Sequence, residues 1–466
     1  MSTTIQFLGA ARTVTGSRHV VSHRGKVVML DCGLFQGLKE WRLKNWEPFP
    51  LPPGYVDDVV LSHAHLDHSG FLPRLCRVGF SGSIYATPST TDLCEIMLPD
   101  SAHIQEEDAR YANKEGFSKH APAMPLYTQA DAERALGAFR TVPYGETRAL
   151  NKNIAFEFLD AGHILGSAMA RFTLRREDET TFSLLFTGDL GRYGEHNLPD
   201  PTSVDAADYL VMESTYGDRV HEDSDAKEVL EDTVRRVSRR GGVVVIPSFA
   251  VGRTQEILAL IHLLQDTDRI PAIPVFLDSP LAINATKIFL NYMQDQRFEM
   301  QCPEASPNNP ILCHNLRITS SVRDSMAIND IREPAIIVSA SGMCEAGRIL
   351  HHLKLHLPNP RNAVVFVGYQ AEGTRGRTIQ GGAREVKIHG QHVPIRAEVV
   401  TMESMSAHAD RDEIFQWLSH FRTPPRKTFV VHGEERVAQS LADEVARRLG
   451  WETCAPAYLD KIALDG

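Results

Sequence analysis

The chain has 466 residues, of which 42% are hydrophobic, and this length predicts two to four domains because a single core stops growing at about 250 to 300 residues. Its 49 basic and 59 acidic residues are mixed along the chain, and the net charge of -10 excludes attraction of a polyanion by bulk charge. The seven scattered cysteines form no CxxC pair, and no stretch approaches the ~18 apolar residues of a membrane span. We therefore expect a cytoplasmic protein with reduced thiols, no disulfide framework and no membrane partner.

The first half of the chain predicts a mixed domain of strands and helices. Short apolar segments that end in Gly, Asp or His predict strands at residues 4–10, 18–25, 26–33 and 57–63. The polar, charged sequence from Thr90 to Gly137 predicts helices over one face of the sheet. Apolar segments then predict further strands at residues 154–163, 168–174, 181–189 and 208–214. Nearly every strand is followed by a polar residue at its carboxyl end.

After Tyr216 the sequence repeats a pattern of strand, glycine-bearing loop and helix. The repeats cover residues 241–264, 273–293, 334–357 and 362–380. Their strands are continuous apolar runs, which indicate a parallel sheet covered on both faces. A helix that begins near Ala226 carries one apolar stripe and belongs to the same layer.

The decapeptide "LSHAHLDHSG" places four residues of metal-ligand type in six positions behind a buried strand. His63 and His65 project to the same side of near-extended backbone, and Asp67 and His68 can turn toward a second ion. A chance cluster of surface histidines is the alternative. Two further candidates, His163 in "GHILGS" and Asp189 in "FTGDLG", are weak alone, because an Asp before Gly is commonly turn chemistry.

Taken together, these segments resemble the metallo-β-lactamase superfamily: "LDCG", "SHAHLDHSG", "GHILGS" and "FTGDLG" stand in the order and approximate spacing of its motifs. Three more, "VMESTYGDR", "SMSAHAD" and "VVHGEE", look like motifs A, B and C of its β-CASP nucleases, close to the nuclease subunit of the mRNA 3′-end cleavage factor and its bacterial relatives. The resemblance covers essentially the whole chain. It implies an α/β fold in which an αββα sandwich, residues 1–214 and 397–466, carries an inserted β-CASP domain of parallel sheet and flanking helices, residues 215–396.

The resemblance also implies two Zn²⁺ ions per chain. One would be held by His63, His65 and His163, and the other by Asp67, His68 and His432. Asp189 would bridge the two ions, and Asp31 would orient ligands from behind. The motif C histidine, His432, favours RNA over DNA as substrate, because DNA-processing members lack it; an ordinary strand-end histidine is the alternative.

Two metal ions can polarise a phosphodiester and lower the pKa of a water molecule between them. Asp67 is therefore counted among the catalytic residues, because it would bind one of these ions. The resemblance assigns His408 as the general acid for the leaving oxygen, held protonated and oriented by Glu213. A buried ion pair that fixes the domain junction is the alternative for Glu213 and His408.

The path of the RNA is expected to begin at Ser406, which by resemblance contacts the scissile phosphate. Glycine-bearing loops in front of helices suit phosphate groups, and their arginines would concentrate positive charge in a cleft between the domains that admits single-stranded RNA. The candidate side chains are Arg253, Arg348, Arg375 and Arg377. Any one of them is more commonly a surface or salt-bridge residue.

The sequence therefore predicts a zinc-dependent endoribonuclease that hydrolyses phosphodiester bonds of single-stranded RNA. A 5′-to-3′ exoribonuclease is the alternative on the same site, and it would need a pocket for a 5′-phosphate. A catalytically silent RNA-binding scaffold is disfavoured because every ligand position is filled, and a small-molecule thioester or lactam hydrolase is disfavoured by the insertion and by motifs A to C. Bacterial relatives make a homodimer plausible.

Overall fold

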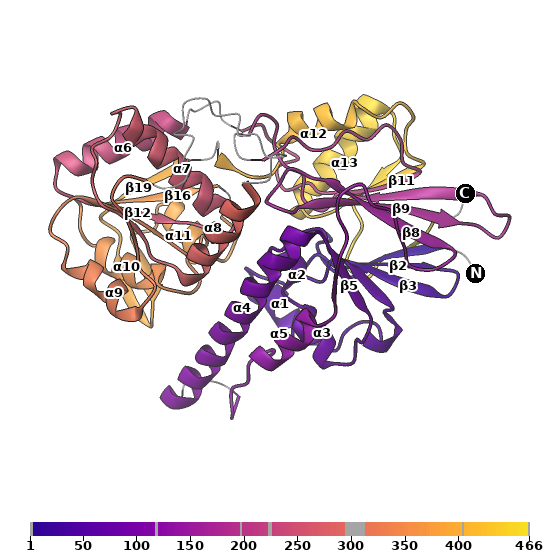
Figure 1. Cartoon of the computed structure of the whole chain (residues 1–466), viewed down its shortest axis with the longest axis horizontal. Coiled ribbons are helices and arrows are strands. Elements are labelled where there is room, and N and C mark those ends of the chain that lie inside the picture. The colour runs from indigo at the N-terminus through magenta and orange to yellow at the C-terminus, as the bar shows by residue number, and fades with distance from the viewer. Residues whose placement is uncertain are drawn as a thin grey trace. The chain divides into compact units, whose positions relative to one another are not determined.

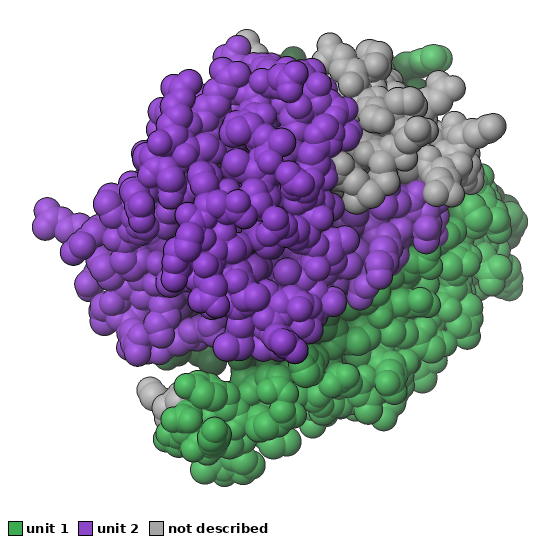
Figure 2. All heavy atoms as spheres, turned by 60° about the vertical axis from the view of Figure 1, so that its left-hand side comes forward, with its two compact units in different colours: residues 1–220, 408–466 green, residues 221–407 purple. Residues whose placement is uncertain are grey.

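The computed structural model describes residues 3–116, 120–195, 198–221, 226–293, 313–368, 370–402 and 405–464 (Figure 1). The chain divides into two compact units (Figure 2): unit 1, residues 1–220 and 408–466, and unit 2, residues 221–407. The strand Glu398–Met402 pairs within the sheet of unit 2, so the boundary expected between residues 396 and 397 is too early. Within the described ranges, no helix is long and apolar enough to cross a bilayer.

Unit 1 is built on two seven-stranded sheets. The strand order of the first sheet is β22 (Lys461–Ala463), β1 (Thr4–Phe7), β2 (His19–His23), β3 (Lys26–Leu30), β4 (Asp58–Val60), β5 (Ser83–Ala86) and β6 (Phe139–Thr141). The order of the second is β21 (Thr453–Cys454), β20 (Lys427–Val430), β11 (Tyr209–Met212), β10 (Thr181–Phe186), β9 (Ala168–Arg175), β8 (Ile154–Asp160) and β7 (Arg148–Ala149). Because β9 is antiparallel to both β8 and β10, while β11 and β20 are parallel to β10, the carboxyl ends of β8, β10, β11 and β20 meet at one edge.

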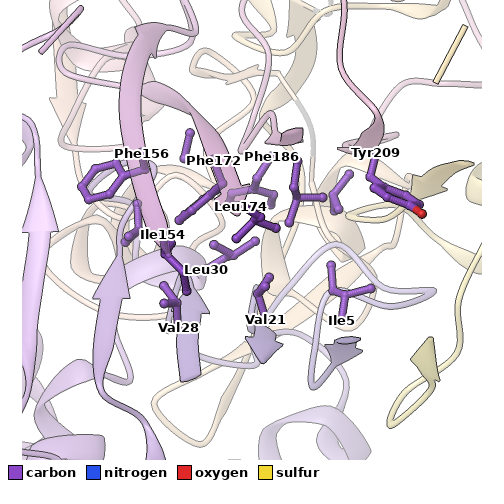
Figure 3. Close-up of a cluster of buried hydrophobic side chains, with 14 of the residues drawn as sticks. Ile5, Val21, Val28, Leu30, Ile154, Phe156, Phe172, Leu174, Phe186 and Tyr209 are labelled. Atoms are coloured by element: carbon purple, nitrogen blue, oxygen red, sulfur yellow. The ribbon is translucent and has the colours of Figure 1, made fainter. Parts of the chain in front are cut away.

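The main core of unit 1 lies between these two sheets. Along β10, Phe182, Leu184 and Phe186 belong to this core, and Leu185 belongs to the cluster on the opposite face of the sheet. Successive strand side chains alternate in direction, which explains the division. Figure 3 shows apolar side chains of β2 and β3 meeting those of β8 and β9.

Helices cover the outer faces of both sheets (Figure 1). The first part of unit 1 contains α1 (Lys39–Lys44), η1 (Pro53–Tyr55), α2 (Leu66–Ser69), α3 (Leu72–Arg77), α4 (Pro88–Glu115) and α5 (Gln129–Leu136). The last part adds α12 (Arg411–Leu418) and α13 (Glu435–Leu449), whose apolar faces pack on the second sheet through Trp417 and Leu441. The expected αββα sandwich is confirmed.

Unit 2 has one six-stranded sheet in which every pairing is parallel. Its order is β14 (Leu316–Ile318), β13 (Val275–Leu277), β15 (Ala335–Ser339), β12 (Val243–Pro247), β16 (Ala363–Val367) and β19 (Glu398–Met402), and a hairpin is formed by β17 (Glu385–Ile388) and β18 (Gln391–Pro394). The helices are α6 (Ala226–Arg239), α7 (Arg253–Asp266), α8 (Pro280–Met293), α9 (Val322–Ala327), η2 (Ile328–Asp330), α10 (Ile349–His356) and α11 (Arg375–Gln380). Every residue of β12, β15 and β16 is buried, as the continuous apolar runs predicted.

Candidate metal centre

The seven residues expected to bind metal converge in unit 1. Four of them belong to the segment that follows β4 and forms α2, while His163, Asp189 and His432 follow β8, β10 and β20. Because those three strands are parallel, their polar ends reach the same edge of the second sheet. The ligand atoms form two groups, each with all atoms within 4.8 Å of one another: His63, His65, His163 and Asp189, and Asp67, His68 and His432.

The first group has the size of a zinc site. His65 Nδ1 lies 3.1 Å from His63 Nε2 and 3.3 Å from His163 Nε2. Asp189 Oδ2 lies 3.6 Å from both of those Nε2 atoms. Zn–N bonds of about 2.0 to 2.1 Å in a tetrahedron separate the ligand atoms by about 3.3 Å. Three imidazoles and a carboxylate at these distances fit one zinc ion.

The second group shares Asp189 with the first. His68 Nε2 lies 3.0 Å from His432 Nε2 and 3.3 Å from Asp189 Oδ1. Asp67 Oδ2 lies 3.6 Å from His432 Nε2. The two oxygens of Asp189 thus face different groups, and Oδ1 is buried without a hydrogen-bond donor among the described residues. A carboxylate in this position fits a bridge between two cations.

Burial and charge set the protonation of these groups in the metal-free chain. Burial lowers the pKa of His65 to about 4 and the pKa of His63 well below its usual value, so both imidazoles are neutral, as metal ligands must be. Burial also acts to lower the pKa of His68, but the carboxylates of Asp189 and Asp31 raise it well above the usual value. Burial acts to raise the pKa of Asp67, but the neighbouring imidazoles of His432 and His68 outweigh this effect and lower the pKa to about 2.

Asp31 lies directly behind His68. Its Oδ2 is 2.6 Å from His68 Nδ1 and accepts hydrogen bonds from the hydroxyls of Ser17 and Ser62, each at 3.0 Å, while its Oδ1 accepts the Ser62 backbone N–H at 2.7 Å. This carboxylate orients the ring so that Nε2 faces the second group. The loop after Asp31 packs closely against the backbone of Asp67 and needs a glycine there, because a Cβ at Gly33 would lie 1.6 Å from the carbonyl oxygen of Asp67.

Glu213 and His408 form a pair beside the metal ligands. His408 Nδ1 lies 3.1 Å from each carboxylate oxygen of Glu213, which is fully buried and also accepts the backbone N–H groups of Leu190 and Thr215. Burial acts to lower the pKa of His408, but the Glu213 carboxylate more than offsets it and raises the pKa to about 8. The His408 ring lies 4.5 Å from the ring of His163.

One contributor to this site was missed from the sequence. Thr215 Oγ1 lies 3.2 Å from His432 Nδ1, which orients the ring so that Nε2 faces His68 and Asp67. His432 itself has a positive φ of 51°, a strained conformation for a residue with a side chain. The sequence did place Thr215 in the segment "ESTYG", two residues after Glu213. That position alone predicts no role, because the sequence does not show which group the hydroxyl would contact.

The candidate RNA-binding arginines lie in unit 2, and three of them are engaged within the protein. Arg253 is buried and pairs with Glu256. Arg348 Nη1 lies 2.7 Å from Asp278 Oδ1, and it also donates to the Thr319 carbonyl at 2.9 Å. Both guanidinium groups therefore already have a structural role, because each neutralises a carboxylate.

The remaining candidates differ in exposure. Arg375 is half-buried, its guanidinium donates to the carbonyls of Lys387 at 2.9 Å and Glu345 at 3.2 Å, and its Nη1 lies 3.4 Å from Glu345 Oε1. Arg377 is exposed on α11, with no ion-pair partner within 4.0 Å in the part of the chain that the structure describes. Ser406 is buried.

Three family models match the chain: the metallo-beta-lactamase superfamily at residues 16–93, the Beta-Casp domain at 254–379, and the Zn-dependent metallo-hydrolase RNA specificity domain at 392–456. Ribonuclease TTHA0252 of Thermus thermophilus is 39% identical over 94% of this chain and 95% of its own length. The chain belongs to the β-CASP family of the metallo-β-lactamase superfamily. This β-CASP protein is a metal-dependent hydrolase.

Other similar proteins agree with this membership. Transcription termination factor FttA of Pyrococcus abyssi is 33% identical to the β-CASP chain over 98% of the chain and 70% of its own length. A solved structure of a protein of unknown function from Enterococcus faecalis superposes with a TM-score of 0.53 over 100% of both chains at 15% identity, which shows a shared fold.

Proposed function

We propose that this β-CASP protein is a zinc-dependent endoribonuclease that hydrolyses phosphodiester bonds of single-stranded RNA. The observation that carries the proposal is Asp189, whose two oxygens face two separate ligand groups beside the His408–Glu213 pair. RNA as substrate is supported by the match to an RNA specificity domain and by the ribonuclease among the similar proteins.

We assign the seven ligands to two zinc ions, three residues to each and Asp189 to both. When bound, two such ions would polarise the phosphodiester and lower the pKa of a water molecule. All seven residues offer imidazole nitrogen or carboxylate oxygen, donor types that zinc accepts: His63, His65 and His163 for one ion, and Asp67, His68 and His432 for the other.

His408 acts in this proposal as the general acid for the leaving oxygen. Its Nδ1 is held by Glu213, so the proton for the leaving group resides on Nε2. A pKa of about 8 keeps the ring protonated near neutral pH, where a donor is required. Glu213 serves as a positioning residue, because its buried carboxylate is fixed by two backbone N–H groups.

The decisive experiment uses one RNA labelled separately at its 5′ and 3′ ends, with a matched DNA. Internal fragments from both labels, with zinc present and the DNA intact, are the expected result. Mononucleotides from the 5′ label would replace the proposal with a 5′-to-3′ exonuclease. No cleavage by a zinc-loaded chain would support a scaffold. The double variant His63→Ala, His65→Ala is the control for contaminating nuclease.

The homodimer expected from the sequence stays a prediction.

For RNA contacts, the proposal relies on Arg377, the exposed candidate, and on Ser406 at the scissile phosphate. Arg377→Glu is expected to weaken RNA binding. It should also make the dependence of log affinity on log salt concentration less steep, by the amount that corresponds to the loss of about one phosphate contact. Arg332→Glu, at another exposed arginine of unit 2, is the matched control for a change of net charge. Equal losses in both variants, measured by RNA titration at several salt concentrations, would contradict the assignment.

A further inference from the structure

A second group of metal-ligand residues lies in unit 2. His262 and Asp266 belong to the last turns of α7, and His314 precedes β14 in the chain. One ligand atom of each lies within 4.8 Å of the other two. We propose that His262, Asp266 and His314 bind a divalent transition-metal ion such as zinc, separate from the metal centre of unit 1.

The geometry follows from the helix. Residues four apart lie on the same helix face, so His262 and Asp266 are neighbours, with His262 Nε2 3.3 Å from Asp266 Oδ2. His314 Nε2 lies 2.8 Å from the other oxygen, Oδ1, and the two imidazole rings are 5.8 Å apart. These separations resemble those between ligand atoms of one zinc ion, about 3.3 Å.

The buried histidine is the independent observation. The His262 side chain is 5% exposed, and neither of its ring nitrogens has a hydrogen-bond partner among the described residues. Its Nε2 is near the Asp266 carboxylate, yet the orientation is wrong for a hydrogen bond. A buried imidazole without partners is costly, and a cation between Nε2 and the carboxylate would satisfy it. An ordinary ion pair of Asp266 with His314 explains His314 but leaves His262 unexplained.

The ligand types select the class of metal. Two imidazoles with one carboxylate suit zinc and neighbouring transition metals, whereas calcium and magnesium prefer oxygen ligands. The His314 side chain is 52% exposed and that of Asp266 is 24% exposed, so an ion can enter from solvent and keep water as a further ligand. Binding would join the end of α7 to the segment before the edge strand β14.

The test is the zinc content of the full chain by equilibrium dialysis and elemental analysis. His314→Ala changes an exposed side chain and is expected to bind one zinc ion fewer than the wild type, and Asp266→Asn is expected to lose the same one equivalent. The control is His392→Ala, which removes another exposed histidine that pairs with a carboxylate in unit 2, Glu385, and should retain the wild-type content. RNA cleavage should be unchanged in all three variants.

Equal zinc content in the wild type and His314→Ala across the titration would overturn the proposal, as would an equal loss in His392→Ala. Hydrogen exchange supplies a second readout: zinc should protect α7 and the residues around β14 in the wild type but not in Asp266→Asn. The same protection in that variant would also overturn it. The readouts compare variants, so a failure of zinc binding in unit 1 would lower every value equally and leave the difference intact.

Discussion

Two of the proposed metal ligands of unit 1 are held by hydrogen bonds to side chains that would not touch the metal themselves. Asp31 fixes His68, and Thr215 fixes His432, each through the Nδ1 atom of the ring. An imidazole whose second nitrogen is engaged in this way has one orientation and is more basic toward a metal. The precision of the site therefore depends on residues outside the ligand set.

Asp31→Asn is expected to lower zinc affinity about 10- to 100-fold, because the amide binds His68 Nδ1 less strongly than the carboxylate. Competition with a chromophoric chelator measures the change. Ser17→Ala, which removes one hydroxyl donor and leaves the carboxylate, should have a smaller effect. Equal affinity in Asp31→Asn and the wild type would contradict the orienting role.

His408→Asn is expected to reduce the cleavage rate by about 10²- to 10⁴-fold at unchanged zinc content, because it removes the proton donor but no ligand. Single-turnover cleavage and elemental analysis on the same sample measure both quantities. Loss of zinc from this variant would show that His408 supports the metal centre and would count against its role as general acid.

Glu213→Gln is expected to shift the alkaline limb of the pH–rate profile to lower pH. A general acid works while protonated, so activity is lost as the pH rises through its pKa. The Glu213 carboxylate raises the pKa of His408 to about 8, and its neutral replacement removes that effect. An unchanged profile would assign the limb to another group.

At the scale of single residues, short motifs named the candidate ligands that the fold brings together, whereas partners distant along the chain could not be named. The candidate ligands could be named because imidazole and carboxylate side chains are grouped in short segments of the sequence. The ion pair of Arg348 could not be predicted, because its partner Asp278 lies 70 residues away in the chain and the two residues meet only through the packing of α10 against β13.

Among the elements of unit 2, β13 and α10 are joined by a buried carboxylate. Asp278 follows β13, and its oxygens contact Arg348 and His352 of the α10 region, each at 2.7 Å, as well as the hydroxyls of Thr319 and Ser325. With so many donors, the carboxylate holds the ends of two strands, β13 and β14, and two helices, α9 and α10, together.

Arg348→Ala is expected to destabilise unit 2 by about 1 to 3 kcal/mol, because the buried Asp278 loses its guanidinium partner. Calorimetry or far-UV circular dichroism measures the unfolding. A loss of RNA affinity at unchanged stability would instead restore the RNA-binding role that the sequence predicted.

Acid should weaken the same junction. Burial acts to raise the pKa of Asp278, but the hydrogen bonds led by that from His352 lower it well below its usual value. The unfolded carboxyl has a pKa of about 3.9, so the stabilisation is complete above about pH 4 and is lost as the pH falls toward the folded pKa. Unit 2 stability should decline less steeply below pH 4 in Asp278→Asn than in the wild type; equal slopes would contradict this.

At the scale of the whole molecule, each unit has its own hydrophobic core, and all seven proposed metal ligands of the catalytic site belong to unit 1. All four tryptophans, Trp41, Trp46, Trp417 and Trp451, also lie in unit 1. Tryptophan fluorescence therefore follows the unfolding of the unit that holds the metal ligands.

Chelation of zinc is expected to lower the unfolding temperature seen by tryptophan fluorescence, because a ligand that binds only the folded state stabilises it by about 2.7 kcal/mol at 100 times its Kd. Readdition of zinc should restore the transition. The variant His63→Ala, His65→Ala should respond less to the chelator, and an equal response would place the stabilising metal elsewhere.

The sequence by itself determined the family and the class of both units, and it predicted the metal ligands, because strand periodicity and short ligand motifs are local properties of the chain. Only the tertiary structure decided that Asp189 faces both ligand groups, that β19 belongs to unit 2, and that Arg253 and Arg348 are engaged in ion pairs. These features depend on which distant groups come within about 4 Å of one another, and that is set by strand order and packing.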